Sequence, residues 1–322
     1  MDIGLYDVDS HNFPNLALMK ISAWHKAQGD NVEFVIPLKH YDKIYVSKVF
    51  GDEYSQMSDY CLQADEIVYG GTGFAITIEN GKEVYHKDRD PNLPEEIEHI
   101  YPDYSLYPEL TKDKAIGFLT RGCCNACSFC IVTEKEGRCS RKVADLSEFW
   151  RGQRKIDLLD ANLLACKDRM ELIGQLARSG SYVDFTQGLD ARFITEEVAG
   201  ALNEVKIRSA HFAFDFMKNE QAIIRGLKTY RKYCKGTDHD SVYILTNYNT
   251  SIEEDIYRVR MVEETGFLPD IRIYRKQTAP QILKDLQRWC NNRIIYRSTA
   301  FMDYVPRADG KTVRQLYFGA RA

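Results

Sequence analysis

The chain alternates short apolar runs with amphipathic segments over most of its length, and this alternation restricts the folds that it can adopt. From Ala115 onward, six runs are typical of buried strands: 115–119, 156–159, 182–185, 210–214, 242–245 and 271–274. Segments with the apolar spacing of helices lie between them, at 169–178, 196–202, 221–233 and 253–265. Strands that alternate with helices form parallel sheets, so the sequence predicts an α/β fold.

Residues 1–85 repeat this pattern on a smaller scale. Apolar runs predict strands at 3–8, 32–35, 43–46 and 64–69. Leu16 to Gln28 has the apolar spacing of a helix, and Gly29 is a natural C-terminal stop. We therefore expect a small Rossmann-like α/β domain over residues 1–85.

A less regular segment follows, over residues 86–112. It holds four of the nine prolines and shows little periodicity, so we interpret it as a linker. Its tyrosine, leucine and isoleucine side chains are too apolar for a free coil, and they suit packing at a domain junction.

Composition narrows the classes of protein. An apolar fraction of 44% and a charged fraction of 28% are ordinary for a globular chain. No apolar run reaches the roughly 18–20 residues that span a bilayer. The N-terminus shows no basic segment followed by an apolar one, which an export signal would have. We therefore expect a cytoplasmic protein with no membrane partner.

Charge is spread unevenly along the chain. Residues 221–322 contain 18 Lys and Arg against 11 Asp and Glu, whereas the whole chain has a net charge of −4. Such a basic region suits a phosphate-bearing partner, nucleic acid included, or it forms a solvated surface of scattered cations. Arg272, Arg275 and Lys276 are the candidates for a site-facing group, because they flank the end of a predicted strand.

Three cysteines, Cys123, Cys127 and Cys130, stand in the spacing CxxxCxxC directly after the strand predicted at 115–119. Cysteine thiolates are the usual ligands of iron–sulfur clusters. Three thiolates on a four-iron cluster leave one iron open, and an open position distinguishes a catalytic metal site from a structural one. A zinc site completed by Cys124 or Cys139, or unligated thiols, are the other interpretations. Disulfides are disfavoured because nine cysteines is an odd number and no export signal precedes them.

With Phe129 before the third cysteine, the motif resembles that of the radical S-adenosylmethionine (SAM) superfamily, CxxxCxφC with φ aromatic. The resemblance implies a partial (β/α)6 barrel over 113–280. After it, the apolar spacing of residues 282–291 predicts a helix, so we expect a C-terminal helical extension over 281–322. The resemblance also implies a [4Fe–4S] cluster on the three cysteines, whose open iron chelates SAM. A reductant such as flavodoxin or ferredoxin then supplies the electron that cleaves SAM to methionine and a 5′-deoxyadenosyl radical, which abstracts hydrogen from the substrate.

Polar residues at the ends of the predicted strands are the candidate SAM contacts that this resemblance implies. They are Phe129 in the cysteine loop, Asp160 and Asn162 after the second strand, Gln187, Asp190 and Arg192 after the third, and Asn247 after the fifth. Asn162 also suits the cap of a following helix. Asp190 either accepts from ribose hydroxyls or pairs with Arg192, and the polar turn after Asn247 also resembles a helix start.

The N-terminal domain resembles the cobalamin-binding domains of one branch of this superfamily. Those domains carry DxHxxG after the first strand, then SxL, then GG. The matching residues here are Asp9, His11, Ser47, Gly70 and Gly71. Pro14 stands in place of the motif's glycine and Val49 in place of its leucine. Two alternatives follow: cobalamin bound through His11, or a domain that only packs on the barrel or shapes its entrance.

The sequence therefore predicts a radical SAM enzyme that abstracts hydrogen from an unidentified substrate, with a phosphate-bearing molecule, a nucleic acid or a peptide as candidate classes. Two other functions stay open. One is a cobalamin-dependent radical SAM methyltransferase, which needs the His11 site. The other is a non-catalytic iron–sulfur electron carrier, whose cluster would have a fourth protein ligand.

Overall fold

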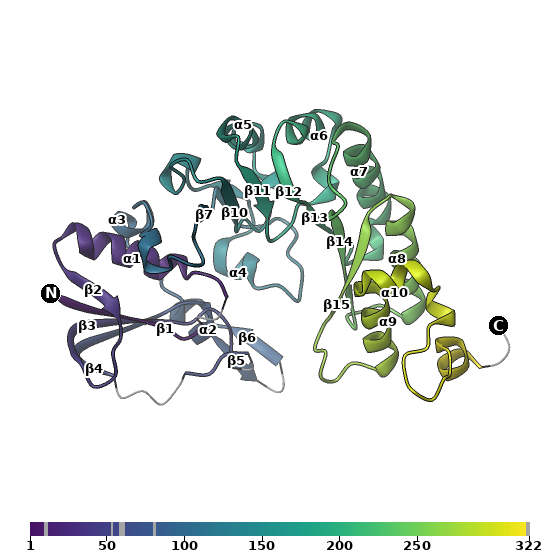
Figure 1. Ribbon diagram of the computed structural model, residues 1–322, viewed down its shortest axis with the longest axis horizontal. Helices are drawn as coiled ribbons and strands as arrows, with labels where there is room; N and C mark the ends of the chain where they lie inside the picture. The colour runs from purple at the N-terminus through teal and green to yellow at the C-terminus, as the bar shows by residue number, and fades with distance from the viewer. Residues whose placement is uncertain (10–11, 53, 58–61, 80–81, 320–322) are drawn as a thin grey trace. The chain divides into compact units, whose positions relative to one another are not determined.

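The computed structural model describes residues 1–9, 12–52, 54–57, 62–79 and 82–319. The chain is an α/β protein with several parallel sheets, which confirms the fold class expected from the alternation of strands and helices (Figure 1). It divides into two compact units, Met1–Ser181 and Tyr182–Ala322. The division falls inside the range 113–280 that is predicted to form one barrel.

The first unit begins with a four-stranded parallel sheet in the order β2-β1-β3-β4. Its strands are β1 (Asp2–Asp7), β2 (Asn31–Phe34), β3 (His40–Ser47) and β4 (Gln63–Gly70). Helix α1 (Leu16–Ala27) follows β1 and begins at Asn15, whose side-chain oxygen accepts from the Leu18 N–H at 3.2 Å. All four strands and the helix match the sequence prediction.

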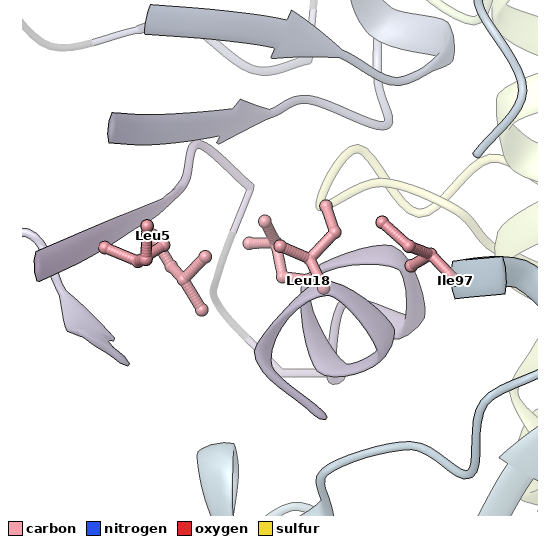
Figure 2. Close-up of a cluster of buried hydrophobic side chains, with 5 residues drawn as sticks. Leu5, Leu18 and Ile97 are labelled. Carbon is pink, nitrogen blue, oxygen red and sulfur yellow. The ribbon is translucent and has the colours of Figure 1, made fainter. Parts of the chain in front are cut away.

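A buried apolar cluster joins this sheet to α1 and to the segment that follows. Ile3 and Leu5 of β1 pack with Leu18 and Ile21 of α1, and Ile97 of α3 (Glu95–Glu98) completes the cluster. Figure 2 shows Leu5, Leu18 and Ile97 coming from the strand, the helix and the short helix α3 in turn. Residues 86–112 thus contribute to the core of the first unit, as their apolar side chains suggest.

Tyr104 ties the same segment to the rest of the first unit. It lies in η2 (Tyr104–Leu106), and its hydroxyl donates to the Phe149 carbonyl at 2.6 Å and accepts from the Ile116 N–H at 3.1 Å. Three elements between β4 and this segment were not predicted from the sequence: α2 (Thr72–Ala75) and the antiparallel pair β5 (Ile76–Glu79) and β6 (Lys82–Tyr85).

The second half of the first unit carries the cysteines. Strand β7 (Lys114–Gly117) pairs in parallel with β10 (Lys155–Leu158). Between them, β8 (Thr120–Arg121) pairs antiparallel with β9 (Arg141–Lys142) and closes a loop that contains α4 (Val132–Glu136). The remaining elements of this half are η3 (Leu146–Glu148), η4 (Leu163–Ala165) and α5 (Arg169–Ser179).

The second unit contains two sets of parallel strands. Strand β11 (Tyr182–Phe185) pairs with β12 (Lys206–Ser209), and β13 (His211–Ala213), β14 (Ser241–Thr246) and β15 (Leu268–Ile273) form a second set. The single strand predicted at 210–214 is therefore too long, and β12 before it was missed. Ala210 separates β12 from β13, and its N–H donates to Asp240 Oδ1 at 3.0 Å.

The described part of the second unit has five α-helices, α6 (Glu196–Asn203), α7 (Glu220–Tyr233), α8 (Ile252–Glu264), α9 (Gln281–Asn291) and α10 (Arg293–Ser298). Of these, α8 packs against β14 and β15, α9 against β15 and α6 against β12 (Figure 1). Phe212 of β13 packs edge-on against Tyr230 of α7 and against Phe267, which places Phe212 in the core. No helix in the described part of the chain is long and apolar enough to cross a membrane.

Candidate functional site

The cysteine loop, residues 122–140, is fixed at its base. The β8–β9 pair closes it, and the Cys123 N–H donates to the Gly137 carbonyl at 3.1 Å. Gly122 has φ +94°, and a Cβ there would lie 2.2 Å from the Cys139 carbonyl oxygen, so only glycine fits. The backbone conformation of Gly122 therefore fixes the direction in which the loop leaves β8.

The Glu136 carboxylate also fixes the base of the cysteine loop. Its Oε2 accepts from the Gly122 N–H at 2.9 Å, and its Oε1 pairs with the Arg121 guanidinium at 3.1 Å. Arg121 also stacks over the Phe118 ring at 3.9 Å. The Arg121 guanidinium, two residues before Cys123, is thus paired with the Glu136 carboxylate.

The three motif thiols differ in exposure from the other cysteines of the loop. Cys123, Cys127 and Cys130 are half-buried, whereas Cys124 and Cys139 are exposed. The Cys130 N–H donates to the Cys127 carbonyl at 3.0 Å, so these two share one turn. Phe129 in that turn is half-buried. Among the described residues, no three His, Cys, Asp or Glu side chains form a group that could hold a metal ion, so the ligand role of the thiols remains a prediction.

Asp160 follows the carboxyl end of β10 and contacts the chain just before the cysteine loop. Its side chain is buried, and its two carboxylate oxygens accept from the Leu119 N–H at 3.1 Å, from the Thr120 N–H and from the Thr120 hydroxyl at 2.6 Å. Burial raises its pKa to about 6, although these hydrogen bonds act in the opposite direction. Asp160 therefore holds the chain that leads from β7 into the cysteine loop.

Asn162 contacts the cysteine loop directly. It is almost fully buried, and its Nδ2 lies 3.6 Å from Cys123 Sγ, within hydrogen-bond range for sulfur. Its Oδ1 accepts from the Ala165 N–H at 3.2 Å and caps η4, which confirms the capping alternative. Because β7 and β10 are parallel neighbours, their carboxyl ends bring the cysteine loop and Asn162 to the same edge.

The predicted residues of the second unit also follow strand ends. Gln187 is exposed after β11. Arg192 donates to both oxygens of Asp190, at 2.9 Å and 2.6 Å, which matches the pairing alternative and is the bidentate form. Asn247, after β14, has φ +62° and donates to the Tyr274 carbonyl at 2.7 Å.

Arg258 of α8 is a residue that sequence reasoning missed. It is fully buried, pairs with Asp255 and donates to the carbonyls of Phe214, Asp215 and Leu245. These carbonyls lie where β13 and β14 end. A signal was present, because Arg258 falls on the same helical stripe as the buried Val259 and Val262.

The cobalamin-like loops of the first unit are packed on one another. A Cβ on Gly71 would lie 2.3 Å from the Lys48 carbonyl oxygen, and one on Gly73 would lie 2.3 Å from that of Phe50. The Ser47 hydroxyl accepts from Asn15 Nδ2 at 2.8 Å. The space beside Gly71 and Gly73 is thus used by the protein's own backbone, whereas Gly70 has open space around it, and cobalamin binding stays a prediction.

Asp9 and His11 belong to the same cobalamin-like motif. The Asp9 carboxylate accepts from the Val49 and Phe50 N–H groups, which again binds one loop to the next. His11, the predicted lower ligand, lies outside the described residues.

Neither a comparison with protein-family models nor a search of curated proteins gave a match for this chain.

Proposed function

We propose that this protein is a radical SAM enzyme built on a partial (β/α)6 barrel. The observation that carries the proposal is the set of three half-buried cysteines on one loop that is fixed at its base and follows a parallel strand. The donor chemistry suits an iron–sulfur cluster, since cysteine sulfur is its usual ligand and an amide N–H points at one of these sulfurs. The CxxxCxφC spacing adds support independent of the geometry.

In this proposal Cys123, Cys127 and Cys130 hold a [4Fe–4S] cluster. When bound, such a cluster supplies the electron that cleaves SAM and so generates the 5′-deoxyadenosyl radical. Cys127 and Cys130 share one turn, the Cys123 backbone is held by the Gly137 carbonyl, and Asp160 holds the chain that leads into the loop. Phe129 lies between two of the ligands in the chain and is half-buried.

Binding of SAM itself falls to polar groups at the strand ends. Arg192 is held in a fixed orientation by Asp190, which prepares its guanidinium for a carboxylate. Gln187 offers an exposed amide that both donates and accepts, as ribose hydroxyls or an adenine edge require. The Asn247 NH₂ group donates to the Tyr274 carbonyl, so we assign its side-chain oxygen to this role. These assignments follow from the resemblance and from the place of the residues after β11 and β14.

The substrate class is open within this proposal. Arg272 on β15 pairs with Asp270 at 3.0 Å and stacks over the Tyr243 ring at 4.5 Å, so a neighbouring acid partly neutralises it. Arg275 and Lys276 follow at the carboxyl end of the same strand. A phosphate-bearing substrate, a nucleotide or nucleic acid included, suits these cations better than a neutral one, and a peptide is the alternative.

Cluster assembly in variants of the loop tests the ligand assignment. After anaerobic reconstitution, we expect about four iron and four sulfide per chain in the wild type and in Cys124→Ala, because Cys124 is exposed and outside the motif. Cys127→Ala should lose the cluster. Loss of the cluster in Cys124→Ala with retention in Cys123→Ala would contradict the ligand assignment. Equal amounts of iron and sulfide in the wild type and in all variants would contradict a cluster on these cysteines.

A further inference from the structure

Asn162 uses both ends of its side-chain amide, and each end has a different partner. Oδ1 accepts from the Ala165 N–H at 3.2 Å, and Nδ2 approaches Cys123 Sγ at 3.6 Å. The side chain is only 1% exposed, so water does not compete strongly for either partner. One residue thus joins the turn after β10 to the first cysteine of the motif.

The cap determines which end of the amide faces the sulfur. An amide oxygen and an amide nitrogen are nearly alike in shape, and hydrogen-bond partners decide between the two orientations. Here the Ala165 N–H is a donor and demands the oxygen, so the NH₂ group must turn toward Cys123. The group that faces the sulfur is therefore a hydrogen-bond donor. A thiolate can accept a hydrogen bond from it, whereas the protonated amine of SAM, itself a donor, could not.

The backbone that carries Asn162 is itself fixed. Two residues earlier, Asp160 accepts from the N–H groups of Leu119 and Thr120, only a few residues before Cys123. Cys123 in turn donates its N–H to the Gly137 carbonyl. The backbone segments that carry the amide donor and the sulfur are thus both fixed by hydrogen bonds. The distance between Asn162 Nδ2 and Cys123 Sγ therefore does not depend on a mobile surface contact.

We propose that Asn162 is a positioning residue that donates a hydrogen bond to the Cys123 thiolate and thereby raises the reduction potential of the bound cluster. The inference rests on the proposed function, since it needs a cluster on Cys123. A hydrogen bond to a ligating sulfur withdraws electron density and stabilises the reduced cluster, which carries one more negative charge. This assigns Asn162 to the cluster and leaves the SAM amine to other groups.

Two substitutions separate the donor from the cap. Asn162→Asp keeps an acceptor for the Ala165 N–H but replaces the donor with a negative oxygen beside the thiolate. Asn162→Ser also caps well, and its shorter side chain removes the amide donor that reaches Cys123. Both should bind a full complement of iron and sulfide, and both should lower the midpoint potential of the cluster, Asn162→Asp by more.

Asn15 provides a matched control in the same unit. Its Oδ1 caps α1 through the Leu18 N–H, and its Nδ2 donates to the Ser47 hydroxyl at 2.8 Å. Asn15→Asp therefore makes the same chemical change at a buried cap whose donor faces an oxygen and no cysteine. We expect it to leave the midpoint potential at the wild-type value.

The measurement is a redox titration of the reconstituted full chain, followed by the EPR signal of the reduced cluster. A potential that falls in both Asn162 variants and stays constant in Asn15→Asp supports the inference. A cluster with the wild-type potential in both Asn162 variants overturns it while the proposed function stands. Loss of the cluster from both variants replaces the tuning role with an assembly role, and a wild type that binds no cluster overturns both proposals.

Discussion

Removing the Arg258 guanidinium should destabilise the protein more than any other single change at an ion pair in the second unit. In Arg258→Met the side chain keeps much of its length but loses its charge and its donors. The buried Asp255 carboxylate then has no cation beside it, and the carbonyls of Phe214 and Leu245 lose donors at 2.7 Å and 2.8 Å. Breaking a buried pair in this way costs about 3–5 kcal/mol of unfolding free energy.

That loss is a large share of the total stability of about 5–15 kcal/mol expected for a domain, so urea unfolding followed by circular dichroism should resolve it. Arg260→Met is the matched control, because Arg260 lies on the same helix and is exposed. We expect this control to change the unfolding free energy by less than about 0.5 kcal/mol. A loss below about 1 kcal/mol in Arg258→Met would refute the argument.

Two further measurements on this pair check the cause of the loss. In the double variant Asp255→Leu/Arg258→Met no lone charge remains buried, so it should be more stable than Arg258→Met alone. Burial raises the pKa of Asp255 even with the guanidinium present, and removing that cation raises it further. A carboxyl whose pKa is raised on folding stabilises the folded state at pH values below its unfolded pKa, and this stabilisation is lost as pH rises through the folded pKa. The deficit of Arg258→Met in unfolding free energy should therefore be larger at pH 8 than at pH 5.

Two other predictions concern the first unit. Because the pKa of Asp160 is about 6 in the folded chain and near 3.8 unfolded, its contribution should fall by about 2 kcal/mol between pH 4.5 and 7, and the wild-type advantage over Asp160→Asn should shrink accordingly. An advantage that is equal at both pH values would contradict this. Gly71→Ala should cost about 2–4 kcal/mol, since φ is +100° and the new Cβ meets a carbonyl oxygen at 2.3 Å. Gly70→Ala, with open space around it, should change stability by less than about 1 kcal/mol, and equal effects of the two substitutions in chemical unfolding would count against the packing described for this loop.

Local sequence signals were sufficient for most helices and parallel strands. Helix α8, for example, starts at Ser251 with Glu254 three residues later, and both capping hydrogen bonds form. Amphipathic spacing then fixes its length within a residue or two. Such signals depend on neighbours in the chain, so they survive without knowledge of the tertiary structure.

Elements that are defined by partners far along the chain were not predictable in the same way. Strand β12 has four residues that alternate charged with less polar ones, and β8 has two, so neither produces a usable pattern. The approach of Asn162 to Cys123 spans 39 positions, and only the pairing of β7 with β10 brings them together. Sequence reasoning named both residues but gave them separate roles.

The central claim is that the three thiols of the cysteine loop support reductive cleavage of SAM, and its most direct test is an assay for 5′-deoxyadenosine. The reconstituted chain is reduced anaerobically and mixed with SAM, beside a variant in which Cys123, Cys127 and Cys130 are all alanine. We expect 5′-deoxyadenosine and methionine in equal amounts from the wild type only. A fully reduced cluster that yields neither product, and whose EPR signal does not change when SAM is added, would contradict the claim and favour an electron carrier.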